Sequence, residues 1–181
     1  MTRWAAIARR IRVPVGFAFA ALYLWLAKPS VLSICAGAIL IIAGLAIRAL
    51  ASGHVRKNEQ LTTSGPYGYT RHPLYLGSLI MASGFSLASH SWWIALMTAL
   101  IFLIIYVPVM LAEETFLRQH FPQFEDYATS VPRLWPRLKS LTSGQGSFSW
   151  KLYCQHREYN ALMGSVAVMV VLAVKLLRNS N

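Results

Sequence analysis

The chain of 181 residues alternates between long apolar runs and polar segments. Apolar residues dominate positions 13–27, 29–47 and 161–174, and positions 72–112 contain no Lys, Arg, Asp or Glu. A helix needs roughly 20 mostly apolar residues to cross a bilayer. The three shorter runs therefore each predict one membrane helix, and the run at 72–112 is long enough for two.

Polar breaks between these runs place the expected turns. Lys28-Pro29 separates the first two runs, and we expect Pro29 in the first turn of the second helix, where proline is tolerated. Positions 89–91 divide the long run into a hairpin, with Trp92 and Trp93 at the membrane interface. The pattern predicts an all-α integral membrane protein with about five transmembrane helices.

The remaining segments are predicted to form short helices and loops. Positions 116–127 mix charged and aromatic residues and predict an amphipathic helix interrupted at Pro122. Positions 149–160 predict a second interfacial helix, and positions 48–71 and 131–149 predict loops. We expect one membrane-embedded domain over 1–181, with an N-terminal hairpin (13–51), a core that includes a cofactor-binding loop (52–137), and an interfacial helix followed by a last membrane helix (149–178).

Composition and charge support the membrane assignment. Hydrophobic residues make up 56% of the chain and charged residues only 13%, about half the share in soluble domains. The net charge of +11 lies at the ends of the apolar runs, which is unlike the basic face of a nucleic-acid-binding domain. With a cytoplasmic N-terminus, only Lys28, Lys175 and Arg178 of the 17 Lys and Arg residues fall outside, as the positive-inside rule expects.

A first candidate functional motif covers positions 65–77, GlyProTyrGlyTyrThrArgHisProLeuTyrLeuGly. Its glycines permit positive φ or close backbone approach, and Arg71 and His72 precede a membrane helix that begins at Pro73. Backbone amides at a helix start can bind a carboxylate or a hydroxyl. The alternative is an interfacial loop in which Arg71 extends toward the membrane surface and the tyrosines anchor the chain.

A second candidate is Glu113-Glu114, which ends the long uncharged run. Ionisable groups at membrane depth are costly and tend to be functional or paired. We expect Glu113 to accept hydrogen bonds from a cofactor or to pair with Arg71, and Glu114 to act as a stop signal at the cytoplasmic interface. Cys35 and Cys154 lack the spacing of a zinc site, so no metal is expected.

In this order, the motifs resemble those of the isoprenylcysteine carboxyl methyltransferases and the related phospholipid N-methyltransferases. The resemblance covers about positions 50–137. It rests on Arg71-His72-Pro73-Leu74-Tyr75-Leu76-Gly77, Glu113-Glu114, Phe121, Tyr127 and Val131-Pro132. Upstream, His54, Asn58-Glu59, Leu61, Thr63-Ser64-Gly65 and Tyr67 are similar to the family's cofactor loop.

The resemblance implies a cytoplasmic pocket for S-adenosylmethionine, with S-adenosylhomocysteine as product. The acceptor would be a lipophilic or membrane-associated small molecule with a carboxylate, amine or thiol, and membrane lipids would be partners. His54 and Asn58 would support the loop, and Arg71 and Glu113 would take part in catalysis. Cofactor contacts would come from Leu61, Tyr67, His72, Pro73, Tyr75 and Glu113, and mainly through backbone from Gln60, Thr62 and Leu74.

Two departures bear on the acceptor. Val109 stands where the prenylcysteine enzymes place a substrate-binding Arg, and Pro122 replaces a Gly, which disfavours a prenylcysteine carboxylate. One alternative is a nicotinamide-dependent reductase, because sterol reductases share a similar ArgHisPro segment; Leu74, where those enzymes have Asn, and Glu113-Glu114 favour the methyltransferase. A non-enzymatic membrane scaffold is the other alternative, and the oligomeric state is unknown.

Overall fold

The computed structural model describes residues 3–56, 60–141 and 147–180, and all regular elements in these ranges are helical. The longer helices are α1 (Arg3–Leu26), α2 (Val31–Ser52), α3 (Pro73–Ser89), α4 (Trp92–Ile101), α5 (Val107–His120) and α8 (Tyr159–Ser180). The short elements are the 3₁₀ turn η1 (Gly65–Gly68), the π turn η2 (Phe102–Tyr106), α6 (Phe124–Ser130) and α7 (Trp150–Gln155). The predicted all-α class is confirmed.

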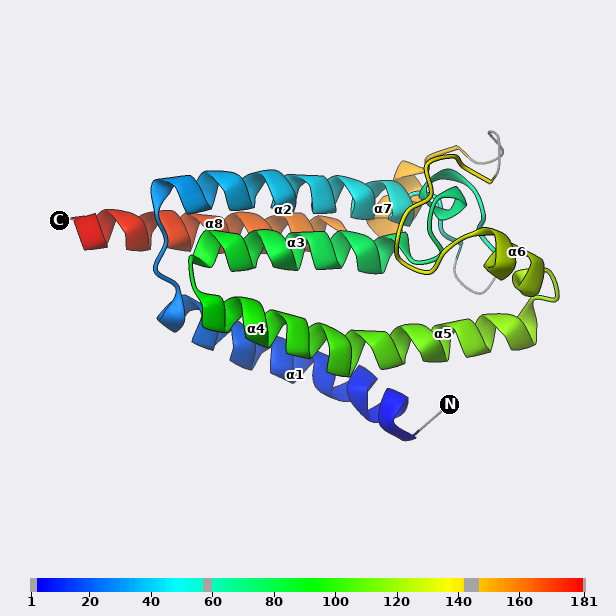
Figure 1. The fold of residues 1–181 in the computed structure, drawn as a ribbon. Coiled ribbons are helices and arrows are strands. Elements are labelled where there is room, and N and C mark those ends of the chain that lie inside the picture. The colour runs from blue at the N-terminus through cyan, green and yellow to red at the C-terminus, as the bar shows by residue number, and fades with distance from the viewer. Residues whose placement is uncertain (1–2, 57–59, 142–146, 181) are drawn as a thin grey trace.

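The helices form two layers (Figure 1). Helices α2 and α3 lie side by side with α8 behind them in this view, where it contacts α2, and α1 lies with the continuous α4–η2–α5 helix in the other layer. A buried cluster of Tyr23, Ala27, Ala88, Ile94 and Leu172 joins the layers at the end opposite the η1 turn. The polar connections thus gather around η1 and α6 at one end of the bundle.

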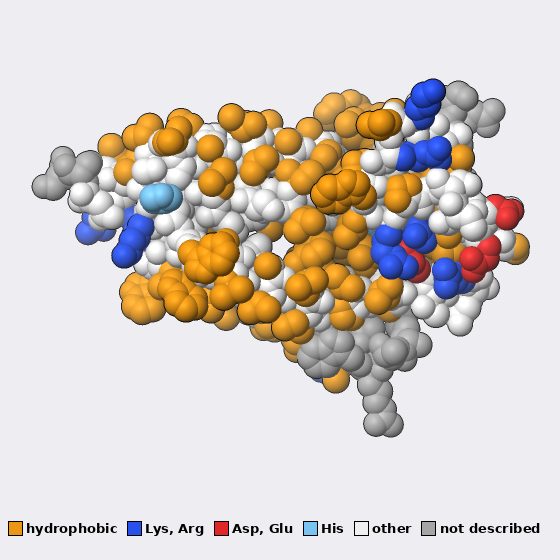
Figure 2. All heavy atoms as spheres, viewed as in Figure 1, with side chains coloured by type: hydrophobic (Ala, Val, Ile, Leu, Met, Phe, Trp, Pro, Cys, Tyr) orange, Lys and Arg blue, Asp and Glu red, His pale blue; other side chains and the backbone are white. Residues whose placement is uncertain are grey.

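The chain is an integral membrane protein. Three helices of the described residues are long and apolar enough to cross a bilayer, namely Val31–Ser52, Trp92–His120 and Tyr159–Asn179. Pro14–Leu26 and Pro73–Ser89 are apolar but shorter, so five spans remain a prediction. Figure 2 shows apolar side chains over the middle of one face and charged side chains toward its two ends, as expected for a protein embedded in a membrane.

The connections agree with the predicted turns, with two corrections. Helix α3 ends at Ser89 and His90 is left-handed (φ 50°), so the predicted hairpin turn is confirmed. Pro29, however, precedes the second helix, because Ser30 is the N-cap of α2. The segment 149–160 is also not one helix: α7 ends at Gln155, and a turn with Arg157 at φ 53° leads into α8.

Helices α2 and α3 pack closely through glycines. A Cβ atom at Gly37 would lie 2.5 Å from the carbonyl oxygen of Gly84, and one at Gly44 would lie 2.6 Å from that of Gly77. Small residues let two membrane helices approach until their backbones touch. This contact holds the first turn of α3, which carries site residues, against the end of α2.

A π turn interrupts the long α4–η2–α5 helix at Phe102–Tyr106. Pro108 follows it in the first turn of α5, and its ring nitrogen cannot donate the usual hydrogen bond to the preceding turn. The helix absorbs this missing bond with one wider turn. The turn lies just before Val109 and Glu113, so it sets the rotation at which both residues face the bundle.

Candidate functional site

The site loop, formed by residues 53–56 and 60–72 between α2 and α3, contains the η1 turn. Gly65 has φ +58°, and a Cβ atom there would lie 2.6 Å from the His54 ring, so glycine is required for both reasons. The His54 ring is fixed in turn, because its Nδ1 lies 2.7 Å from the carbonyl oxygen of Leu50 in α2. The predicted supporting role of His54 agrees with this contact, whereas Asn58 and Glu59 lie outside the described residues.

The η1 turn also fixes Tyr67. Its ring is buried, and its carbonyl oxygen accepts a 2.8 Å hydrogen bond from the Tyr127 hydroxyl of α6. Burial raises the pKa of the Tyr67 phenol, and the Glu113 carboxylate raises it further. Burial likewise raises the pKa of Tyr127. Both phenols therefore stay neutral at physiological pH and keep their hydroxyl hydrogens as donors.

Arg71 and His72 are held by the segment that follows α6. The N–H of Arg71 donates to the carbonyl of Pro132 at 2.9 Å, and the N–H of His72 donates to that of Arg133 at 3.2 Å. The Thr70 hydroxyl donates to the same Arg133 carbonyl at 2.9 Å. The predicted ValPro motif thus touches the predicted ArgHisPro motif through backbone hydrogen bonds.

Glu114 is buried at the centre of three basic side chains, with 3% of its surface exposed. Its carboxylate accepts from Arg133 Nε at 3.0 Å and Nη2 at 2.9 Å, and it lies 3.2 Å from Arg71 Nη1. His72 Nε2 lies 3.0 Å from the same carboxylate and donates to it in the tautomer that carries the proton there. The stop-signal prediction for Glu114 was therefore wrong, and Arg71 pairs with Glu114 rather than with Glu113.

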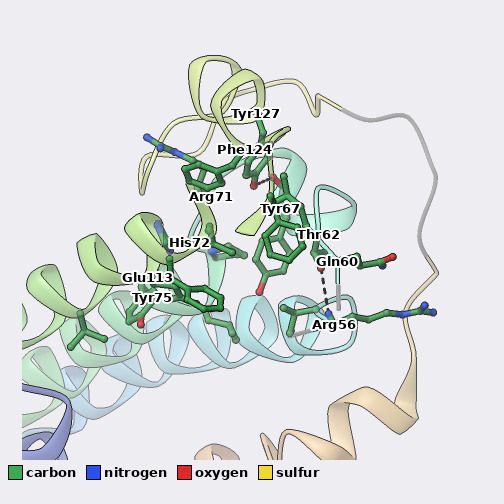
Figure 3. Close-up of a pocket in the computed structure, with 18 residues that line it drawn as sticks. Arg56, Gln60, Thr62, Tyr67, Arg71, His72, Tyr75, Glu113, Phe124 and Tyr127 are labelled. Carbon is green, nitrogen blue, oxygen red and sulfur yellow. Dashed lines mark hydrogen bonds between the residues drawn. The ribbon is translucent and has the colours of Figure 1, made fainter. Parts of the chain in front are cut away.

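Neighbouring residues on a helix point about 100° apart, which explains the different positions of the two glutamates. Glu114 turns toward the site loop, whereas Glu113 faces a pocket of about 440 Å³ between that loop and α5. This volume is within the range of small-molecule sites. Figure 3 shows Glu113, His72 and Tyr75 on one side of the pocket, and Tyr67, Thr62 and Gln60 on the other.

The structure brings all the candidate cofactor and catalytic residues to this one pocket. Its lining includes Gln60, Leu61, Thr62, Tyr67, Arg71, His72, Pro73, Leu74, Tyr75 and Glu113. The Thr62 hydroxyl is partly occupied, because it accepts a 3.3 Å hydrogen bond from the Arg56 N–H. The loop before α3 and the glutamate on α5 are far apart in the sequence, and they therefore share one cavity only in the folded chain.

Several lining residues were missed from the sequence. Phe116, Leu117 and Phe124 join Phe121 and Tyr127 at the wall formed by α5 and α6, whereas Val55 and Arg56 lie in the connection that follows α2. Phe116 and Leu117 follow Glu113 by three and four residues, and residues at this spacing share a helix face. That spacing was a usable signal, whereas Val55, Arg56 and Phe124 depend on how the loops fold back.

The Arg71 Nε atom and the Glu113 carboxylate are polar groups of the lining without a hydrogen-bond partner among the described residues. Arg71 Nε is buried and makes no hydrogen bond, although the same guanidinium pairs with Glu114. No hydrogen bond or ion pair within the described residues involves the Glu113 carboxylate, which is half-buried. A buried donor without an acceptor is costly, so the pocket suits a ligand that carries both acceptors and donors. No group of three His, Cys, Asp or Glu side chains in the described residues could hold a metal ion.

Comparison with known proteins adds the family. A family model described as phospholipid methyltransferase matches residues 32–123, which include α2, the site loop, α3 and the glutamate pair. The chain belongs to the phospholipid methyltransferase family. It is therefore related to membrane methyltransferases, as the sequence motifs indicate.

Two curated relatives match part of the chain. The cobalt-zinc-cadmium resistance protein CzcN of Cupriavidus metallidurans is 39% identical over 94 residues, which are 52% of this chain and 43% of that protein. The nickel-cobalt-cadmium resistance protein NccN of Alcaligenes xylosoxydans xylosoxydans is 38% identical over 88 residues, which are 49% of this chain and 41% of that protein. The match thus spans less than half of each relative. No solved structure matches the chain.

Proposed function

We propose that this family member transfers a methyl group from S-adenosylmethionine to a lipophilic acceptor at the cytoplasmic membrane face. One observation carries the proposal: a single pocket is lined both by polar residues of the site loop and by apolar residues of the membrane bundle. A methyl donor of this class is polar and arrives from water, whereas a lipid-like acceptor arrives from the bilayer. The pocket offers a surface to each.

The polar half of the pocket suits the cofactor. Tyr67, Phe121 and Phe124 provide aromatic surface for a nucleoside, and Glu113 provides a carboxylate for a hydroxyl or an ammonium group. The unpartnered Arg71 Nε can donate to a carboxylate of the cofactor. When bound, S-adenosylmethionine supplies an electrophilic methyl group on a sulfonium.

The apolar half suits the acceptor. Val109 and Tyr75 line the pocket and also belong to an intramembrane cluster with Ile105, Val15 and Tyr106. The substrate-binding Arg of the prenylcysteine enzymes has no counterpart on this wall, because Val109 occupies its position and is buried. The wall therefore favours an uncharged acceptor tail, and it disfavours a carboxylate held at that depth.

The residues of this chain would act mainly by positioning. Methyl transfer needs the acceptor atom in line with the methyl group and water kept away, and it needs little covalent help from the protein. Arg71 and His72 are rigid because Glu114 and the Pro132–Arg133 backbone hold them. If the acceptor atom carries a proton, Glu113 can accept it. The Glu113 carboxylate lines the pocket and has no hydrogen bond or ion pair within the described residues.

Calorimetric titration of the detergent-purified protein tests the cofactor. We expect saturable binding of S-adenosylhomocysteine and none of a reduced nicotinamide cofactor. Glu113→Ala should weaken binding about 10- to 100-fold, as expected for the loss of a hydrogen bond to a charged group. Glu125→Ala is the matched control, because Glu125 lies nearby on α6 with its side chain 64% exposed and outside the pocket lining. Binding of the nicotinamide cofactor alone would favour a reductase, and binding of neither would favour a scaffold.

Product identification tests the acceptor. Membrane lipids and small thiols are incubated with the protein and isotopically labelled S-adenosylmethionine, and labelled products are identified by mass spectrometry. We expect label in a lipid-soluble product that is absent with Glu113→Ala and present with Glu125→Ala. Cofactor binding without any labelled lipid would contradict the proposed acceptor class.

A further inference from the structure

The segment 131–141 crosses the site end of the bundle, and we call it the strap. Its backbone is bonded to the site loop along its whole length. In addition to the bonds at Pro132 and Arg133, the N–H of Arg137 donates to the Tyr69 carbonyl and the N–H of Leu141 donates to the Gly68 carbonyl, both at 3.0 Å. The strap and the site loop are therefore one unit, and the loop leads directly into membrane helix α3.

The strap exposes large apolar side chains that the protein does not cover. Trp135 is 82% exposed and Leu138 is completely exposed. Two such exposed side chains close together are unfavourable in water, because removing apolar surface from water lowers the free energy of the protein. Trp135 is also the residue type that prefers the boundary between headgroups and acyl chains.

The charge of the same segment is entirely positive. The strap contains Arg133, Arg137 and Lys139, and no Asp or Glu occurs between Asp126 and Glu158. Arg133 is bound to Glu114 and Arg137 donates to the Ser130 carbonyl, but no interaction within the described chain involves Lys139. Exposed apolar groups interleaved with basic ones are typical of segments that bind anionic lipid surfaces.

We propose that the strap docks on the anionic lipid surface of the membrane that holds the bundle. Trp135 and Leu138 enter the boundary between headgroups and acyl chains, and Lys139 faces lipid phosphates. A bilayer is favoured over a protein partner because the strap is tied to residues that immediately precede α3 and, through Glu114, to the end of the Trp92–His120 span. The position of the strap relative to the membrane is thus set by α3 and by α5.

Spin-label accessibility in bilayers tests this. In a Cys35→Ala/Cys154→Ser background, which removes both free cysteines, a nitroxide is attached at Leu138→Cys or, as control, at Gln123→Cys on the exposed start of α6. The proteins are placed in bilayers of phosphatidylcholine alone or with phosphatidylglycerol. Collisions with oxygen, which concentrates in lipid, are compared with collisions with a water-soluble nickel chelate.

We expect the label at 138 to be shielded from nickel in anionic bilayers and the label at 123 to stay exposed in both. Lys139→Gln should lower the ratio of embedded to exposed label about fivefold in anionic bilayers only, the effect expected for one basic residue near such a surface. Full nickel access at 138 in both bilayers would overturn the proposal, as would shielding that is indifferent to lipid charge and to Lys139→Gln. Shielding that rises with protein concentration and broadens the spectrum would instead indicate a second copy of the chain.

Discussion

Removing the buried anion at the site should destabilise the protein strongly. In the parent protein the Glu114 carboxylate contacts Arg71, His72 and Arg133. Glu114→Gln leaves these three side chains around a neutral amide. Breaking a buried ion pair by removing one partner costs about 3–5 kcal/mol. The Arg133 side chain is 43% exposed and can be rehydrated, whereas the Arg71 side chain is only 11% exposed, so we expect a loss near the lower end, about 3 kcal/mol.

The assay is equilibrium unfolding of the purified protein in mixed micelles, followed by circular dichroism. Glu125→Gln is the control, since its pair with Arg118 is about half exposed and surface pairs contribute less than about 1 kcal/mol. The double variant Glu114→Gln/Arg133→Gln should lose less than the sum of the two single variants, because Arg133 then has no charge left unpaired. Equal loss for Glu114→Gln and Glu125→Gln would refute the central role of Glu114.

Two further predictions concern packing and pH. Gly84→Ala should destabilise the protein by about 1–3 kcal/mol in thermal unfolding, because its Cβ atom would lie 2.7 Å from the Gly37 carbonyl oxygen. Gly164→Ala is the control and should be neutral or stabilising, because open space surrounds Gly164. Equal effects of the two substitutions would contradict the close α2–α3 contact. The unfolding free energy should fall as pH rises above about 10, because unfolded tyrosines then ionise while Tyr67 and Tyr127, whose pKa values burial raises, stay protonated when folded. Tyr127→Phe should reduce this slope between pH 9 and 11, and an unchanged slope would argue against burial of the phenol.

Much of the site could be predicted because its motifs are local. The turn at 65–68 and the helix start at Pro73 follow from glycine and proline, whose backbone preferences do not depend on distant residues. The residues predicted to contact the cofactor, which run from Gln60 to Glu113, all line one pocket. Their contact with a cofactor remains a proposal, and so do the count of five spans and the cytoplasmic orientation.

The errors share one physical cause. The roles of Glu113 and Glu114 were assigned from their place at the end of an apolar run, but their directions depend on the rotation of α5 after the π turn. The predicted loop over 131–149 is confirmed in its described part, but no local sequence signal indicates that the strap backbone pairs with residues 68–72. Phe124 was missed because α6 folds back over the pocket only after the break at Phe121.

The sequence by itself determined the helices, their membrane character and the ArgHisPro and GluGlu motifs, since hydropathy, helix breakers and turn residues act over a few positions along the chain. Only the tertiary structure decided which glutamate binds the basic side chains and which faces the cavity, and that the strap locks the site loop. Those outcomes depend on contacts between segments far apart in sequence, such as Arg133 with Glu114, whose geometry is set by the packing of whole helices.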